Sequence, residues 1–76
     1  MEQIKIDGHD DAIVGRSLIW RDGIRVDVFV YSGELILAKL MERDGMTDEE
    51  ALEYIDFNIE GAYLGEGTPV IMWEAV

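Results

Sequence analysis

Residues 46–69 decide the fold of this chain, and they read Met-Thr-Asp-Glu-Glu-Ala-Leu-Glu-Tyr-Ile-Asp-Phe-Asn-Ile-Glu-Gly-Ala-Tyr-Leu-Gly-Glu-Gly-Thr-Pro. Thr47 and Glu50 have the spacing of a capping box, in which each side chain accepts a hydrogen bond from the backbone N–H of the other residue. A helix is therefore predicted to begin at Thr47. The apolar residues that follow at helical spacing form its predicted buried stripe: Leu52, Ile55 and Ile59, with Ala51 and Ala62 as small packing positions.

The same stretch closes on a glycine-rich turn. Gly61 or Gly65 is expected to end the helix, because glycine readily adopts the left-handed conformation that closes helices. Residues 65–69 are predicted to turn the chain toward a last strand at residues 70–74. Three aromatic residues on or beside the helix are predicted to lie in the core or at its edge: Tyr54, Phe57 and Tyr63.

A β-hairpin is predicted before the helices. Asp22-Gly23 separates two apolar runs, residues 12–20 and 24–31, and both turn residues tolerate the positive φ of tight hairpin turns. Along the second run, valines alternate with charged and aromatic residues. We expect the valine face to meet the helices, and the face with Phe29 and Tyr31 to be exposed or partly covered.

A first helix is predicted over residues 34–43. Ser32 is in position to cap its N-terminus, and Gly45 is in position to end it. Its predicted buried stripe consists of Ile36, Leu37, Leu40 and Met41.

The expected order of elements is β-β-β-α-α-β, in which residues 3–6 would form the first strand. This order predicts an α+β fold: a small antiparallel sheet of three or four strands with two helices packed on one face. A chain of 76 residues is expected to be one domain, residues 1–76. It contains no cysteine, so neither disulfides nor thiolate metal sites can support its small core.

Charge is distributed unevenly along the chain, whose net charge is −11. Residues 1–43 hold all six basic residues and eight acids, whereas residues 44–76 hold nine acids and no base. Such an acidic chain is repelled by nucleic acids and by anionic membranes, so its expected partners are cationic. It has no run long enough to span a membrane and no signal-peptide pattern, so a cytoplasmic protein is expected. High charge also simply keeps a small protein soluble.

Four carboxylates at helical spacing are predicted to share one face of the second helix. They span roughly 16 Å, and each neighbouring pair repels by a few tenths of a kcal/mol. Their spacing is comparable to that of phosphates along a nucleic-acid strand, so this face is a candidate imitation of DNA. A solvated acidic face without a partner is the alternative. The four residues, named here the acidic row, are Glu49, Glu53, Asp56 and Glu60; Glu50 and Glu66 complete the predicted partner-binding residues.

The second candidate for metal binding or catalysis is the loop that contains Asp7, His9, Asp10 and Asp11. Carboxylates suit Mg²⁺ or Ca²⁺, but the EF-hand spacing is absent. A turn held by side-chain–backbone hydrogen bonds is the preferred interpretation, and no metal or cofactor is predicted. A small metal-dependent enzyme using this loop remains an alternative.

No catalytic or phosphate-binding signature is present, and the chain is predicted not to be an enzyme. Ser17 and Ser32 lie outside any nucleophile elbow. The glycines of residues 61–67 follow a helix and have no cation nearby, unlike a phosphate-binding loop. The two helices around Gly45 are not a DNA-binding helix-turn-helix, because phosphates would repel the acidic second helix.

Several ordered motifs resemble a family of small acidic proteins encoded by tailed bacteriophages. The resemblance covers most of residues 8–71 and implies expression in a bacterial cytoplasm. It implies no catalytic residue. His9 departs from the family pattern, which has a large aromatic residue there. The motifs are Asp-Asp-Ala-Ile-Val-Gly at 10–15, Gly-Met-Thr-x-Glu-Glu-Ala at 45–51, Phe-Asn-x-x-Gly-Ala at 57–62 and Gly-Glu-Gly-Thr-Pro at 65–69.

The resemblance and the acidic row together predict a binding protein. Its expected partner is a basic host protein, such as a nuclease or a CRISPR effector, whose nucleic-acid site the carboxylates would occupy. The alternative is a structural or accessory phage protein that self-associates through the sheet face around Phe29 and Tyr31. The chain is expected to be a monomer or a homodimer.

Overall fold

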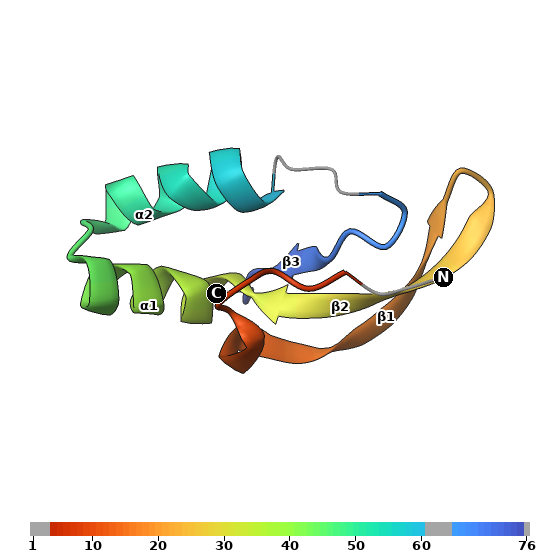
Figure 1. The fold of residues 1–76 in the computed structure, drawn as a ribbon, viewed down its shortest axis with the longest axis horizontal. Coiled ribbons are helices and arrows are strands. Elements are labelled where there is room, and N and C mark those ends of the chain that lie inside the picture. The colour runs from red at the N-terminus through yellow and green to blue at the C-terminus, as the bar shows by residue number, and fades with distance from the viewer. Residues whose placement is uncertain (1–3, 61–64, 76) are drawn as a thin grey trace.

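The computed structural model describes residues 4–60 and 65–75 and confirms an α+β fold (Figure 1). The order β-β-α-α-β matches the prediction apart from the expected strand at 3–6, where residues 4–6 belong to no strand. The elements are the 3₁₀ turn η1 (Asp10–Ala12), β1 (Ile13–Arg21), β2 (Ile24–Ser32), α1 (Gly33–Asp44), α2 (Asp48–Ile55), the π-helical turn η2 (Asp56–Glu60) and β3 (Val70–Met72).

β1 and β2 form the predicted antiparallel hairpin. Their pairing runs down to Arg21 opposite Ile24, and the turn residues Asp22 and Gly23 have φ values of 49° and 78°. Two consecutive positive φ angles match the right-handed twist of the flanking strands. The register shifts once, between Ile13 and Gly15, so a β-bulge lies at the start of β1.

β3 corrects the prediction of an antiparallel sheet, because it pairs parallel to β2. Val30 lies opposite Val70 and Ser32 opposite Met72, in a sheet of order β1-β2-β3. α1 continues beyond the end of β2, and α2 runs back beside α1 (Figure 1). The chain therefore returns toward the start of β2 before β3 begins, and such a helical crossover joins parallel strands.

Local capping places both helices where the sequence predicts them. The Ser32 hydroxyl accepts a hydrogen bond of 3.1 Å from the Leu35 N–H, and Gly45 ends α1 with φ 69°. Thr47 and Glu50 form the complete capping box: the Thr47 hydroxyl accepts from the Glu50 N–H at 3.2 Å, and the Glu50 carboxylate accepts from the Thr47 N–H at 2.9 Å.

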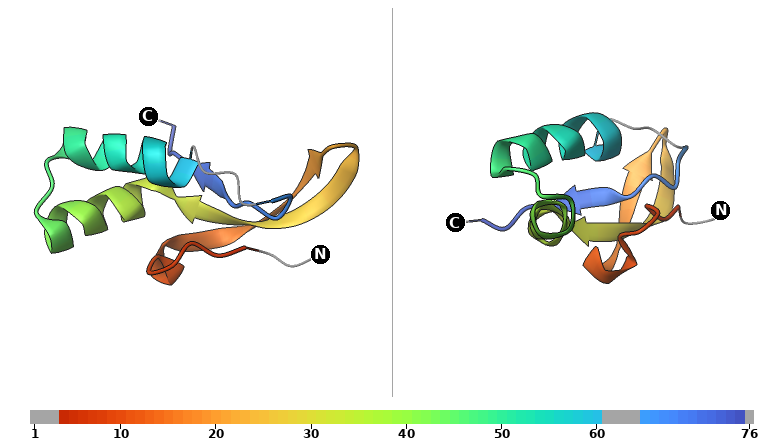
Figure 2. Two further views of the ribbon diagram at one scale, coloured as in Figure 1. Left: turned by 45° about the horizontal axis from the view of Figure 1, so that its top comes forward. Right: turned by 60° about the vertical axis from the view of Figure 1, so that its left-hand side comes forward.

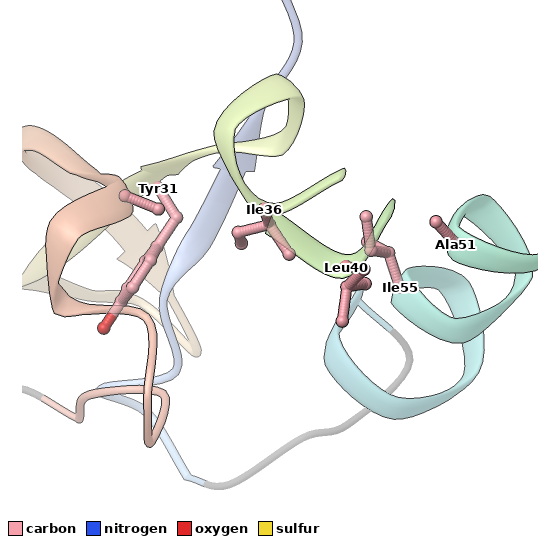
Figure 3. Close-up of a cluster of buried hydrophobic side chains, with 6 residues drawn as sticks. Tyr31, Ile36, Leu40, Ala51 and Ile55 are labelled. Carbon is pink, nitrogen blue, oxygen red and sulfur yellow. The ribbon is translucent and has the colours of Figure 1, made fainter. Parts of the chain in front are cut away.

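The core lies where α1 meets the end of the sheet and α2 (Figure 3). Tyr31 is completely buried in it, although it lies on the β2 face that was predicted to be exposed or partly covered. The aromatic face of β2 therefore contributes Tyr31 to the core, and the valine face is covered as well, because Val26 and Val28 are 4% and 0% exposed. The buried members of the cluster are Ala12, Tyr31, Ile36, Leu40, Ala51 and Ile55.

The N-terminal segment covers the aromatic face. The Ile6 N–H donates a 2.8 Å hydrogen bond to the Tyr31 hydroxyl, and the Lys5 ammonium lies 5.6 Å from the centre of the Phe29 ring. Of the two residues predicted to centre a self-association surface, Tyr31 is therefore covered by this chain's own residues and Phe29 is partly buried.

The molecule is elongated, with extents of 39 × 22 × 22 Å (Figure 2). A compact domain of this length has a radius of gyration of about 11.4 Å, and this chain has 12.8 Å. Met41 and Leu52, predicted to be buried, are 40% and 41% exposed as a consequence of the narrow helical end. Within the described residues, no helix has the length and apolar composition needed to cross a bilayer.

Candidate binding face on α2

α2 presents one face to the core and the opposite face to solvent. Ala51 and Ile55 are fully buried against α1. Glu49, Glu53 and Asp56 lie on exposed positions around the helix. The packing of the apolar stripe therefore turns the predicted acidic row outward.

The acidic row has no counter-charge in the described part of the chain. Residues 44–60 contain seven acids and no base, and among the described ion pairs only Asp44 of these acids has a partner, the neighbouring Arg43. Repulsion between the other acids of this segment is therefore not relieved by a base within it. The basic side chains that form ion pairs do so elsewhere, in Lys5–Asp10, Arg16–Asp27, Lys39–Asp11 and Arg43–Asp44. None of these four pairs includes a member of the acidic row.

The row divides at Asp56, where the α-helix becomes the π-helical turn η2. A π-turn is wider than an α-turn, and such turns occur frequently at functional sites. At its end, the Glu60 carboxylate accepts a 2.7 Å hydrogen bond from the Trp73 indole N–H. The carboxylates of the row without a hydrogen-bond partner among the described residues are therefore those of Glu49, Glu53 and Asp56.

The two other predicted partner-binding residues have different surroundings. The Glu50 carboxylate is held in the capping box, and the hydrogen bond from the Thr47 backbone N–H lowers its pKa. Glu66 lies next to the hairpin, where its carbonyl accepts a 2.7 Å hydrogen bond from the Arg21 guanidinium. Because Arg21 is the last residue of β1, this hydrogen bond holds Glu66 beside the hairpin, and Glu66 does not extend the row on α2.

A groove of about 340 Å³ runs along the helix beside the row. Phe57 is 81% exposed at this groove, so the prediction that it packs in the core or at its edge was wrong. Tyr54 is 40% exposed. Tyr63 lies outside the described residues. The sequence could have indicated that Phe57 lies beside the acidic row, because Phe57 follows Glu53 by four residues and this spacing places side chains on one helix face. Met46, Glu50, Glu53, Tyr54, Phe57 and Asn58 line the groove.

This combination of groups suits a cationic side chain. A guanidinium or ammonium group is attracted to the face of an aromatic ring and forms charge-assisted hydrogen bonds with carboxylates. Glu53 belongs to both the row and the groove, so one bound cation can contact the carboxylate and the Phe57 ring together.

The cluster at Asp7–Asp11 does not converge on a site. His9 is only 6% exposed, and burial lowers its pKa, with Lys39 and Arg43 lowering it further. Asp10 pairs with Lys5, and Asp11 pairs with Lys39. Across the described residues, no group of three His, Cys, Asp or Glu side chains is placed to hold a metal ion. These residues join the N-terminal segment to α1.

Comparisons of the chain with protein-family models, with curated proteins and with solved structures found no match. The resemblance to phage proteins therefore stays a prediction.

Proposed function

We propose that this protein binds a basic surface of another protein through the acidic row and the adjoining groove. The observation that supports this proposal is the exposure of Glu49, Glu53 and Asp56 beside Phe57, with no ion pair to any of these carboxylates among the described residues.

The carboxylates attract the basic surface of the partner and favour its binding along the row. Each like-charged pair along the helix costs a few tenths of a kcal/mol in the free protein. Lysine or arginine side chains of a partner relieve that repulsion, so binding recovers this free energy. A surface with one sign of charge also accelerates encounter with an oppositely charged surface, and salt weakens the effect.

Phe57 supplies the apolar contact that charge alone lacks. Interface hot spots are commonly aromatic residues that become buried on binding, surrounded by polar groups that exclude water. An 81% exposed phenylalanine has nearly its whole side chain available for this role. The acidic groups around the groove restrict the partner to one with cations near the apolar pocket.

The target class follows from this chemistry. Proteins that bind nucleic acids carry clustered lysine and arginine residues, and a carboxylate row at phosphate-like spacing competes for them. The resemblance to small phage proteins makes a host defence nuclease or CRISPR effector the target to test, in the bacterial cytoplasm. The proposed effect is inhibition by occlusion of the nucleic-acid site, without catalysis.

The test is affinity capture from a bacterial lysate at low salt, with elution by a salt gradient and, separately, by duplex DNA. Nucleic-acid-binding proteins are expected to bind, to elute as salt rises and to be displaced by the DNA. The double variant Glu53→Lys with Asp56→Lys is expected to reduce capture at least about tenfold.

The matched control is Asp7→Lys with Glu42→Lys, which changes the net charge equally at two exposed positions outside the acidic row and outside the four ion pairs named above. This control is expected to retain most of the capture. Equal capture by a folded Glu53→Lys, Asp56→Lys variant would refute the proposal.

A further inference from the structure

β1 is an edge strand of the described sheet. It has nine residues, Ile13–Arg21, and it is the outer strand of the sheet, paired on one side with β2. Edge strands normally avoid pairing with other chains by being short, or by carrying charged side chains (lysine above all), proline or a bulge. β1 contains no proline or lysine, and of its two arginines Arg16 is paired with Asp27 of β2. Its bulge lies at its first residues, so Gly15–Arg21 is a regular ladder.

Two large exposed side chains of this ladder are apolar. Leu18 is 58% exposed and Trp20 is 67% exposed. Their partners in β2 are Asp27 and Arg25, so both side chains lie on the sheet face that continues from Phe29. The Arg25 guanidinium lies 5.4 Å from the centre of the Trp20 ring and covers only part of it.

We propose that two copies of this chain pair through their β1 edges, antiparallel and about a two-fold axis, to form one continuous six-stranded sheet. This inference is independent of the proposed function, because α2 lies at the opposite end of the long axis (Figure 2). Both acidic rows stay exposed in such a dimer.

The distribution of charge favours the β1 edge over the rest of the surface as the place where two copies meet. Two chains of net charge −11 repel each other over most approaches, and the helical end, residues 44–60, carries seven acids without a base. β1 has the opposite character, with Arg16 and Arg21 and no acid. The β1 edges are therefore a surface on which two copies meet without opposing carboxylates.

The regular ladder also determines the register. Antiparallel pairing of Gly15–Arg21 with itself is symmetric about Leu18, so Leu18 lies opposite Leu18 of the second copy. Trp20 then lies opposite Arg16 of the second copy, an aromatic–cation pair, and no two arginines are opposite each other. A pairing centred elsewhere leaves part of the ladder without hydrogen-bond partners.

Light scattering after size-exclusion chromatography, with samples from about 1 μM to about 1 mM, tests the assembly. The expected mass at high concentration is twice the 8.6 kDa of the chain. Added salt is expected to strengthen the dimer, because it screens the repulsion between two acidic chains. Capture of a partner through the acidic row is expected to weaken with salt. The opposite salt dependences distinguish the two proposals, and either can be refuted without the other.

Two variants distinguish pairing through the β1 edge from non-specific association of exposed apolar side chains. Trp20→Glu is expected to raise the dimer Kd at least about tenfold. Ile24→Glu is the control, because Ile24 is 49% exposed but lies on β2 and on the other face of the hairpin. Circular dichroism on both variants confirms that they fold.

A cysteine scan tests the register in a chain that has no cysteine of its own. Leu18→Cys is expected to form a disulfide-linked dimer under mild oxidation, much faster than the exposed control Ala38→Cys on α1. A monomer at every concentration would overturn the proposal and leave the edge to an extended segment of another protein. Equal cross-linking of the two cysteine variants would overturn it as well.

Discussion

The indole of Trp73 lies directly against Gly33, the first residue of α1. A Cβ at Gly33 would be 2.5 Å from Cε2 of Trp73, closer than real Cβ atoms approach their neighbours. The same indole donates its N–H to Glu60. One side chain after β3 therefore joins the start of α1 to the end of η2, and it positions one end of the acidic row.

Gly33→Ala is expected to destabilise the protein by roughly 1–3 kcal/mol, because the added methyl group must displace the Trp73 ring. Urea denaturation gives the free energy of unfolding of each variant. Gly15→Ala is the control, since a Cβ there has no neighbour within 4 Å, and its expected change is within about 0.5 kcal/mol. Equal losses in the two variants would contradict the close contact.

Tyr31→Phe is expected to lower the free energy of unfolding by about 1 kcal/mol, because the Ile6 N–H loses its acceptor. Hydrogen exchange of the Ile6 amide is expected to accelerate more than exchange in β2. Tyr54→Phe is the control, since Tyr54 is half-exposed on α2. An Ile6 amide that exchanges equally fast in wild type and in Tyr31→Phe would show that the N-terminal segment is held by other contacts.

Stability is expected to fall as the pH drops below the usual His9 pKa of 6.5. Burial lowers the pKa of the folded imidazole, so below this value the unfolded chain binds more protons than the folded one. The contribution of neutral His9 to the free energy of unfolding is complete above pH 6.5, and it is lost progressively as the pH falls toward the pKa of His9 in the folded protein. Urea midpoints at several pH values between 7.5 and 5, compared with those of His9→Phe, measure it.

The His9→Phe variant removes this titration while it keeps an aromatic ring at the buried position. Its midpoint is expected to change less than that of the wild type over the same pH range. The carboxylates whose pKa values are lowered, those of Asp11, Asp44 and Glu50, titrate in more acidic solution and affect both proteins alike. Identical pH profiles for the two proteins would contradict a buried neutral imidazole.

Glu53→Lys is expected to stabilise the free protein by about 0.3–0.5 kcal/mol at low salt, because the lysine introduced there follows Glu49 by four residues. High salt is expected to remove the gain. Glu53→Gln is the intermediate case, which removes repulsion without adding attraction. Thermal unfolding at two ionic strengths gives both comparisons. A stability loss in Glu53→Lys would mean that Glu53 has a structural role.

Local features of the fold were predictable from the sequence because short-range physics determines them. The capping box of Thr47 and Glu50, the αL residue Gly45 and the Asp22-Gly23 turn each depend on residues within a few positions of one another. The acidic row follows in the same way from helical spacing, and its exposure follows from the apolar stripe opposite it.

The direction of β3 and the environment of Tyr31 were not predictable in this way. Alternation along β2 shows that its two faces differ, but it does not say which face the helices and residues 4–6 will contact. Tyr31 is covered through long-range contacts, among them the hydrogen bond from Ile6, 25 positions away in the sequence. The parallel pairing of β3 likewise depends on how far the helix pair carries the chain back.

The sequence by itself determined the helices, the hairpin and the line of carboxylates, because each is set by the spacing of neighbouring residues. The tertiary structure decided which apolar residues remain outside: Phe57 beside the acidic row, and Leu18 and Trp20 on the β1 edge. Burial depends on contacts between distant segments, and a narrow, elongated molecule has too little interior to cover all of its large apolar side chains.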